Sequence, residues 1–155
     1  MRRLTVAPLS PAKIDQCFAL VRLGSPHVKP ELWQTYAMDY LAESRAGNAG
    51  ILSVEEDRGY LLGVLVYEVG PDLHHGITMI AKDCFVYDCL ERGKREIALS
   101  LIAGLEELAN QQRCTSLHLR LPVSRADPVD HWLAGLLQSS GHSIVAVQYC
   151  KQLRA

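Results

Sequence analysis

The chain lacks several features that define specialised classes of protein. No apolar run reaches the roughly 18 residues of a membrane-spanning helix. The formal net charge is −1, so no field of one sign attracts nucleic acid or an anionic membrane. Arg2 and Arg3 begin the chain without the apolar segment of a secretory signal, and no repeat or interdomain linker follows. We therefore expect one cytoplasmic domain, 1–155, with neither nucleic acid nor membrane as a partner.

The chain also lacks a metal-binding pattern. Its five cysteines are odd in number and lie mostly in apolar stretches, which favours buried free thiols in a reducing compartment. They are Cys17, Cys84, Cys89, Cys114 and Cys150. No second cysteine pair completes a zinc site, and the adjacent His74 and His75 would point apart in an extended turn. We expect no metal.

Apolar periodicity is what the chain does offer, and it predicts six strands. These are Leu4–Leu9, Gly50–Glu56, Tyr60–Val69, Ile77–Asp88, Thr115–Leu121 and Ser143–Leu153. Asp57-Arg58-Gly59 separates the second strand from the third and indicates a hairpin with glycine at its tip.

Four helices are predicted between these strands from their caps and apolar stripes. They begin at Ser10-Pro11, at Pro30, near Arg95 and at Asp127-Pro128. Gly24 ends the first helix, Gln111 the third, and Gly141 the fourth. The order is β-α-α-β-β-β-α-β-α-β, which is typical of an α+β protein.

The stretch from Phe85 to Leu121 carries the strongest functional signal. A strand end leads through a charged turn with Gly93 into a long amphipathic helix, and then into a further strand. Free amides at such a helix start point at whatever lies over the turn, and they favour an anion.

This element order, together with VYDCLERGKREIALSLIAGLEELANQQRC, resembles the GNAT acyltransferase superfamily. The resemblance implies a mixed, mostly antiparallel central sheet flanked by four helices, with acetyl-CoA as acyl donor. In that family a loop of pattern [Q/R]-x-x-G-x-[G/A], within a longer R-G-x-G-x-G/A, binds the coenzyme A pyrophosphate. Arg92 and Gly93 match its opening Arg-Gly, and Lys94 takes the variable position. Val86 and Tyr87 fall where main-chain groups contact the pantetheine arm and the oxyanion.

The rest of that loop departs from the family pattern in either of two alignments. Without a gap, Arg95 and Ile97 replace the later glycines. With one inserted residue, Ala98 takes the Gly/Ala position and Glu96 takes the first glycine. A glutamate there would repel pyrophosphate, and Lys94 and Arg95 would partly offset that repulsion. The implied cofactor contacts are thus Val86, Tyr87, Arg92, Gly93, Lys94, Arg95, Ile97 and Ala98.

Catalysis by such a fold needs a proton acceptor for the amine. Glu68 and Asp83, on two central strands, are the candidates, and solvated strand-end charges are the alternative. The family's usual acid, a tyrosine four residues before a Gly-Phe pair, is absent: Gly141-His142 stands for that pair, and Leu137 cannot donate a proton. The family asparagine seven residues earlier falls on Asp130.

The sequence leaves three hypotheses open. The first is an N-acetyltransferase acting on a small-molecule or peptide amine. The second is a GNAT-like module that binds acyl-CoA or a protein partner without turnover, and the third is a fold with no ligand. Trp33, Tyr36 and Tyr40 would line an acceptor pocket or pack in the core. Family members often pair through sheet edges, which makes a homodimer possible.

Overall fold

The computed structural model describes residues 2–121, 132–145 and 150–153. The chain forms two compact units, Met1–Pro122 and Val123–Ala155. Among the described helices, none is both long and apolar enough to cross a membrane. A single domain over 1–155 stays a prediction.

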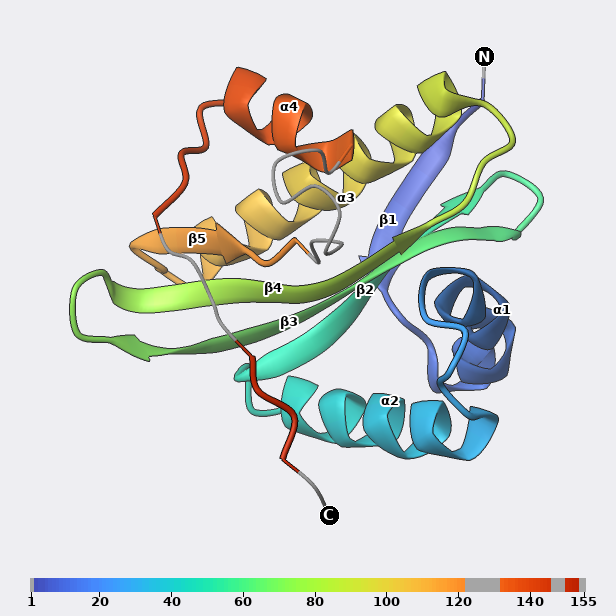
Figure 1. Ribbon diagram of the computed structural model, residues 1–155, viewed down its shortest axis with the longest axis horizontal. Helices are drawn as coiled ribbons and strands as arrows, with labels where there is room; N and C mark the ends of the chain where they lie inside the picture. Colours follow the sequence, from blue (N-terminus) through green and yellow to red (C-terminus); the bar gives the residue numbers. More distant parts are fainter. Residues whose placement is uncertain (1, 122–131, 146–149, 154–155) are drawn as a thin grey trace. The chain divides into compact units, whose positions relative to one another are not determined.

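The first unit is built on a five-stranded sheet (Figure 1). Strands β1 to β4 are antiparallel neighbours in chain order, and β5 pairs with β4 in parallel. The strands are β1 Leu4–Pro8, β2 Ala49–Glu56, β3 Leu61–Asp72, β4 Gly76–Val86 and β5 Ser116–Leu119. The prediction of an α+β fold with a mixed, mostly antiparallel sheet is confirmed.

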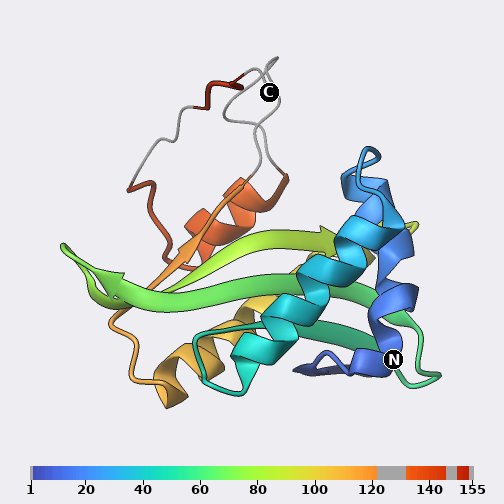
Figure 2. The ribbon, with the colours of Figure 1, turned by 90° about the horizontal axis from the view of Figure 1, so that it is seen from below.

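Helices cover both faces of this sheet (Figure 2). A short 3-10 turn η1 (Pro11–Lys13), α1 (Ile14–Gly24) and α2 (Pro30–Ser44) pack on one face, where Ile51, Val64 and Val66 are buried. The opposite face carries α3 (Glu91–Gln111), which packs on Leu52, Leu65 and Met79, among others. The sheet therefore separates an α1/α2 core from an α3 core.

Helix α3 buries the stripe that its sequence predicts. Ile97, Ala98, Leu101, Ile102 and Leu105 are at most 4% exposed. The helix comes close to β3 because Gly63 has no side chain there: a Cβ would lie 2.9 Å from Cγ2 of Ile97.

The β2–β3 and β3–β4 turns can be compared with the turns that the sequence predicts. Gly59 has φ +80° at the tip of the β2–β3 hairpin, as the Asp57-Arg58-Gly59 sequence predicts. The turn between β3 and β4, predicted over residues 70–76, is shorter than predicted, because β3 continues to Asp72 and β4 starts at Gly76.

The second unit contains α4, Trp132–Ser139. Gly141 has φ +90°, and the amide of His142 donates to the carbonyl of Leu137 at 2.9 Å, so the predicted glycine stop is confirmed. The predicted helix start at Asp127-Pro128, and Asp130, lie outside the described residues. The predicted strand Ser143–Leu153 also falls partly outside them, and its described ends are not in a strand.

The α3 core gives a direct test of the fold. Leu101 is 0% exposed and Leu99, on the same helix, is 42% exposed. We expect Leu101→Ala to lower the free energy of unfolding by about 2–5 kcal/mol, because it leaves a cavity. Leu99→Ala should cost less than about 1 kcal/mol. Urea denaturation followed by circular dichroism measures both, and equal losses would contradict this packing.

Candidate functional site

A β-bulge in β4 lies at the centre of the candidate site. Asp83 pairs with Val66 of β3 while Ala81 pairs with Tyr67, which leaves Lys82 as one extra residue. Val66 packs in the α1/α2 core, whereas Tyr67 and Ala81 pack in the α3 core. In regular alternation Lys82 and Asp83 would face opposite sides of the sheet. The bulge turns both consecutive side chains towards α2.

Glu68 of β3 is one of the two carboxylates on this face. Its Oε1 accepts a hydrogen bond from Lys82 Nζ at 2.8 Å and another from the Tyr40 hydroxyl, and Lys82 also donates to that hydroxyl at 3.0 Å. These bonds from Lys82 and Tyr40 lower the pKa of Glu68, and the bond to Glu68 raises the pKa of Lys82. Glu68 is therefore stabilised as an anion and is a weak proton acceptor.

Asp83 is the second carboxylate, and its partner is a hydroxyl. The Tyr36 hydroxyl donates to Asp83 Oδ2 at 2.9 Å, and the rings of Tyr36 and Tyr40 lie 4.6 Å apart. Burial, followed by the hydrogen bond with Tyr40 and the charge of Asp83, raises the pKa of Tyr36. Tyr36 therefore stays a neutral phenol whose hydroxyl donates a hydrogen bond to the carboxylate.

Of the three aromatic residues predicted on α2, one packs in the core and two bind carboxylates of the sheet. Trp33 is 2% exposed, and its Nε1 donates to the carbonyl of Ile14 at 2.8 Å, so it belongs to the core. Tyr36 and Tyr40, one helical turn apart, reach the sheet and hold the two carboxylates. The sequence did not reveal this pairing, because the partners lie 47 and 28 residues apart.

The pairing between β4 and β5 ends next to the bulge. Strand β5 pairs with β4 from Thr78 to Ala81, and the amide of Arg120 makes a last bond to the carbonyl of Ala81 at 3.0 Å. Within residues 2–121, no strand pairs with this edge of β4 beyond that point. The positive charge of Arg120 acts here too, since it helps to lower the pKa of Glu68.

The free edge of β4 exposes particular main-chain groups. The amide of Tyr87 donates to the carbonyl of Leu62 in β3 at 2.9 Å, so it faces β3. By strand alternation, the N–H and C=O groups of Cys84 and Val86 face the free edge. A contact between these groups of Val86 and a pantetheine arm stays a prediction. The amide of Tyr87 is already bonded to β3, and a cofactor contact by this residue stays a prediction.

The start of α3 differs from its prediction. The helix begins at Glu91 rather than near Arg95, so Gly93 lies in its first turn and not in a loop. The first intrahelical bond runs from the amide of Lys94 to the carbonyl of Leu90. The amides of Glu91 to Gly93 are consequently the ones that the helix leaves unpaired.

An anion already lies at this helix start, and it belongs to the chain itself. Asp88 accepts the amide hydrogen of Leu90 on Oδ1 at 2.9 Å and forms an ion pair with Arg2 through Oδ2. Its carboxylate fills the space in front of Gly93, where a Cβ would lie 2.3 Å from Oδ2. The Leu90 amide and then the Arg2 guanidinium lower the pKa of Asp88. Asp88, which no sequence pattern singled out, is therefore an ion-paired carboxylate beside the first turn of α3.

The remaining residues of the predicted phosphate loop lie on the body of α3. Arg92 pairs with Glu96 at 3.6 Å, and Lys94 pairs with Glu91 at 2.9 Å. Ile97 and Ala98 are 0% exposed, and their amides lie inside the helix. The helix starts four residues earlier than expected, and the role of Ile97 and Ala98 as cofactor contacts stays a prediction. Arg95 falls in the second turn.

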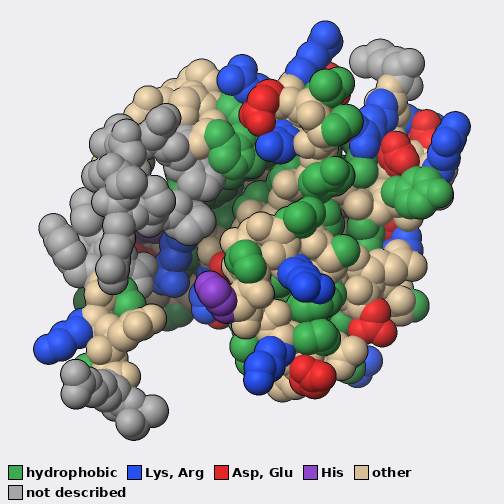
Figure 3. Space-filling model, turned by 45° about the vertical axis from the view of Figure 1, so that its right-hand side comes forward, with side chains coloured by type: hydrophobic (Ala, Val, Ile, Leu, Met, Phe, Trp, Pro, Cys, Tyr) green, Lys and Arg blue, Asp and Glu red, His purple; other side chains and the backbone are tan. Residues whose placement is uncertain are grey.

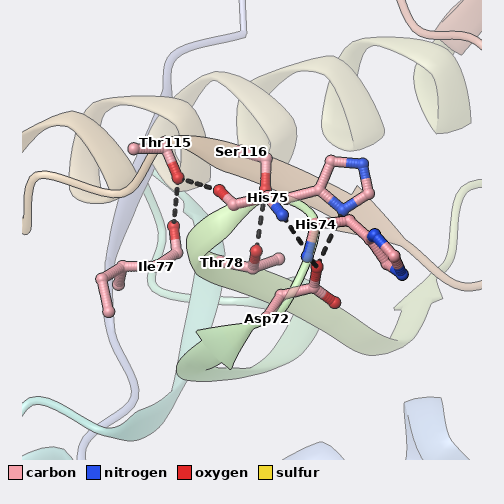
Figure 4. Close-up of polar contacts among 7 residues, drawn as sticks. All are labelled: Asp72, His74, His75, Ile77, Thr78, Thr115 and Ser116. Atoms are coloured by element: carbon pink, nitrogen blue, oxygen red, sulfur yellow. Dashed lines mark hydrogen bonds and ion pairs between the residues drawn. The ribbon is translucent and has the colours of Figure 1, made fainter.

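The cysteines and histidines form no metal site in the described part of the chain. Cys17 is buried and burial raises its pKa to about 12, but Cys89 and Cys150 are exposed, so the prediction of burial is wrong for those two. His74 and His75 lie in the exposed β3–β4 turn (Figure 4). Asp72 accepts both of their amide hydrogens there, at 2.8 and 2.9 Å.

On the face of the molecule seen in Figure 3, the charged side chains do not gather into a patch of one sign. Basic and acidic side chains alternate there among hydrophobic ones. This agrees with the net charge of −1.

Comparison of the structure with solved structures identifies the fold. An aminoglycoside N-acetyltransferase AAC(6')-Iy in complex with CoA has a TM-score of 0.78 at 12% identity, covering 100% of this chain and 97% of that one. A ribosomal-protein-alanine N-acetyltransferase from Brucella melitensis gives 0.71 at 20%, covering 97% and 100%. Glucosamine-6-phosphate N-acetyltransferase from Arabidopsis thaliana gives 0.71 at 16%, covering 98% and 99%. The chain therefore has the fold of the GNAT acetyltransferases.

Comparison of the sequence alone gives no match. No protein-family model matches the chain, and no curated protein matches it. The similarity to known proteins therefore lies in the arrangement of the elements.

The Glu68–Lys82 pair predicts a pH-dependent stability. Because the pKa of Glu68 is lowered from 4.5, its contribution is present above that value and is lost as the pH falls through the lowered pKa. Glu68→Gln should therefore cost up to about 1 kcal/mol at pH 7, and this cost should shrink as the pH falls through the lowered pKa. Glu43→Gln, an exposed change on α2, is the control. Urea denaturation between pH 2 and 8 measures this, and a pH-independent difference would contradict it.

Proposed function

We propose that this protein is an N-acetyltransferase that moves an acetyl group from acetyl-CoA to a primary amine, with Asp83 as the proton acceptor. The observation that carries the proposal is the bulge at Lys82 beside the end of β5. It brings a tyrosine-bound carboxylate next to main-chain groups without a strand partner. A donor bound at the strand edge and an amine bound at Asp83 would then lie within reach of each other.

The described residues fit a coenzyme A molecule in two places. The main-chain groups of Cys84 and Val86 at the free edge suit the amides of a pantetheine arm, which pair with them as a strand would. The Asp88 carboxylate lies beside Gly93 at the start of α3, and its presence there supports the proposal that this end of the helix tolerates an anion. The amides of Glu91, Arg92 and Gly93 would hold the pyrophosphate, with Lys94 and Arg95 nearby in sequence.

When bound, acetyl-CoA supplies a thioester whose acetyl group can be transferred. Asp83 would take one proton of the ammonium group, and the neutral amine nitrogen would form its new bond to the acetyl carbon as the carbon–sulfur bond breaks. The second proton of the nitrogen would pass to water. Tyr36 holds the Asp83 carboxylate through its hydroxyl. Leu137 has no proton to give, so the leaving thiolate takes its proton from water.

Asp83 is preferred to Glu68 because their partners differ. Glu68 is bound by a lysine and a tyrosine that lower its pKa, which opposes proton uptake. We propose that Glu68 and Lys82 instead hold the bulge and Tyr40 in place. The amine acceptor is a small molecule or a peptide. The neighbours named for aminoglycosides, glucosamine 6-phosphate and ribosomal-protein alanine represent both kinds.

A second candidate is a module that binds acyl-CoA without turnover. One observation favours it: Leu137 stands where the resemblance implies a proton donor. The two candidates differ in catalysis and not in donor binding, so each property needs its own measurement.

Donor binding is tested by thermal stability. Acetyl-CoA at a hundredfold excess over its Kd should raise the free energy of unfolding by about 2.7 kcal/mol, because it binds only the folded protein. Differential scanning fluorimetry with millimolar acetyl-CoA, and with adenosine as a control, measures the shift. No shift at millimolar acetyl-CoA would exclude both the enzyme and the acyl-CoA module.

Catalysis is tested by release of the coenzyme A thiol across a panel of amines, including aminoglycosides, glucosamine 6-phosphate and peptides. With an active acceptor, Asp83→Asn should lower kcat by about 10²–10⁴-fold and leave the acetyl-CoA shift intact, because only proton transfer is lost. Asp39→Asn, an exposed change on α2, should behave like the unaltered protein. Full activity of Asp83→Asn would rule out Asp83 as the base.

A further inference from the structure

Arg120 lies on the same face of the sheet as the polar cluster around the β4 bulge. Its amide donates to the Ala81 carbonyl at 3.0 Å, which continues the β5–β4 pairing and brings Arg120 beside Lys82. Leu119 packs against the α3 core, so strand alternation turns the next side chain, that of Arg120, towards the α2 face. The charge of Arg120 helps to lower the pKa of Glu68, which lies on that face. Arg120 is therefore a neighbour of both Lys82 and Glu68.

The charges on this face leave one cation and one anion unpaired in the part of the chain that the structure describes. Lys82 and Glu68 neutralise each other through their ion pair at 2.8 Å. The Asp83 carboxylate accepts a hydrogen bond from the Tyr36 hydroxyl and forms no ion pair with another described residue. Arg120 is exposed, and it too forms no ion pair with any described residue. One positive and one negative charge therefore remain for a ligand.

The strand geometry sets the separation of these two charges. Neighbouring strands lie about 4.8 Å apart and successive residues rise about 3.3 Å, so the backbones of Arg120 and Asp83 are roughly 6 Å apart. A molecule with an ammonium group and an anionic group a few bonds apart can reach both. A diamine would place its second positive charge near Arg120, which repels it.

We propose that the acceptor is a small zwitterion, a primary amine that also carries a carboxylate or a phosphate, with its ammonium group at Asp83 and its anionic group at Arg120. This inference rests on the proposed function, because it assigns the acceptor of the same reaction. The planar guanidinium of Arg120 presents paired N–H donors that match the oxygens of either anion. Lys82 is less suited to that role, because Glu68 already holds its ammonium group. Arg120 is therefore the residue that determines specificity.

Matched amines test the proposal: β-alanine against propylamine, and phosphoethanolamine against ethanolamine. We expect kcat/KM, measured by thiol release from acetyl-CoA, to be about tenfold or more higher for the anionic member of at least one pair. The pair with the larger ratio distinguishes a carboxylate from a phosphate. Arg120→Gln should remove this preference and leave propylamine and ethanolamine unchanged. Arg58→Gln, the same change in the exposed β2–β3 hairpin, should match the unaltered protein.

Two further variants separate recognition by Arg120 from a structural role. Arg120→Glu should reverse the preference, so that 1,3-diaminopropane reacts faster than β-alanine, because the new carboxylate attracts the second ammonium group. Arg120→Lys keeps the charge and should retain part of the preference for the anionic amines. A residue with a structural role alone would change the rates of all these amines together.

The outcomes separate this inference from the proposed function. Equal kcat/KM values within both pairs, or an undiminished preference in Arg120→Gln, would overturn the inference and leave the acetyltransferase standing. If no amine releases thiol, the proposed activity fails, and isothermal titration calorimetry with the same four amines decides the inference. Tighter binding of an anionic amine than of its partner, lost in Arg120→Gln, would then support it. Equal affinities within both pairs, or no binding at all, would overturn it.

Discussion

The strict alternation of side chains along a β-strand is the constraint on which this site depends. A regular β4 would place Lys82 and Asp83 on opposite faces, one under α2 and the other under α3. The single extra residue places both under α2, where two tyrosines receive them. The same region is where β5 ends its pairing, so one local irregularity combines a polar cluster with a strand edge that β5 does not cover. Active regions often use bulges in this way to redirect a side chain.

Much of the fold could be predicted because its signals are local. The apolar stripe of α3, the glycine at the tip of the β2–β3 hairpin and the glycine after α4 each reflect a single element and its solvent exposure. The element order followed from these stripes and turns, and it was enough to suggest the fold.

The candidate site was predicted less well because it depends on distant partners. A bulge leaves no mark on the apolar pattern, so the sequence could not show that Lys82 and Asp83 share a face. The start of α3 was misplaced because Gly93 was interpreted as a turn residue. In the structure this glycine makes room for Asp88, whose partner Arg2 lies 86 residues away. No local rule connects those two residues.

Tyr36 and Tyr40 lie one turn apart on α2, and each hydroxyl holds one carboxylate of the sheet. The two hydrogen bonds consequently share one rigid support. Any displacement of α2 away from the sheet breaks both together, whereas rotation of a single side chain breaks only one. Helix α2 is therefore the element through which Glu68 and Asp83, on different strands, respond to the same mechanical change.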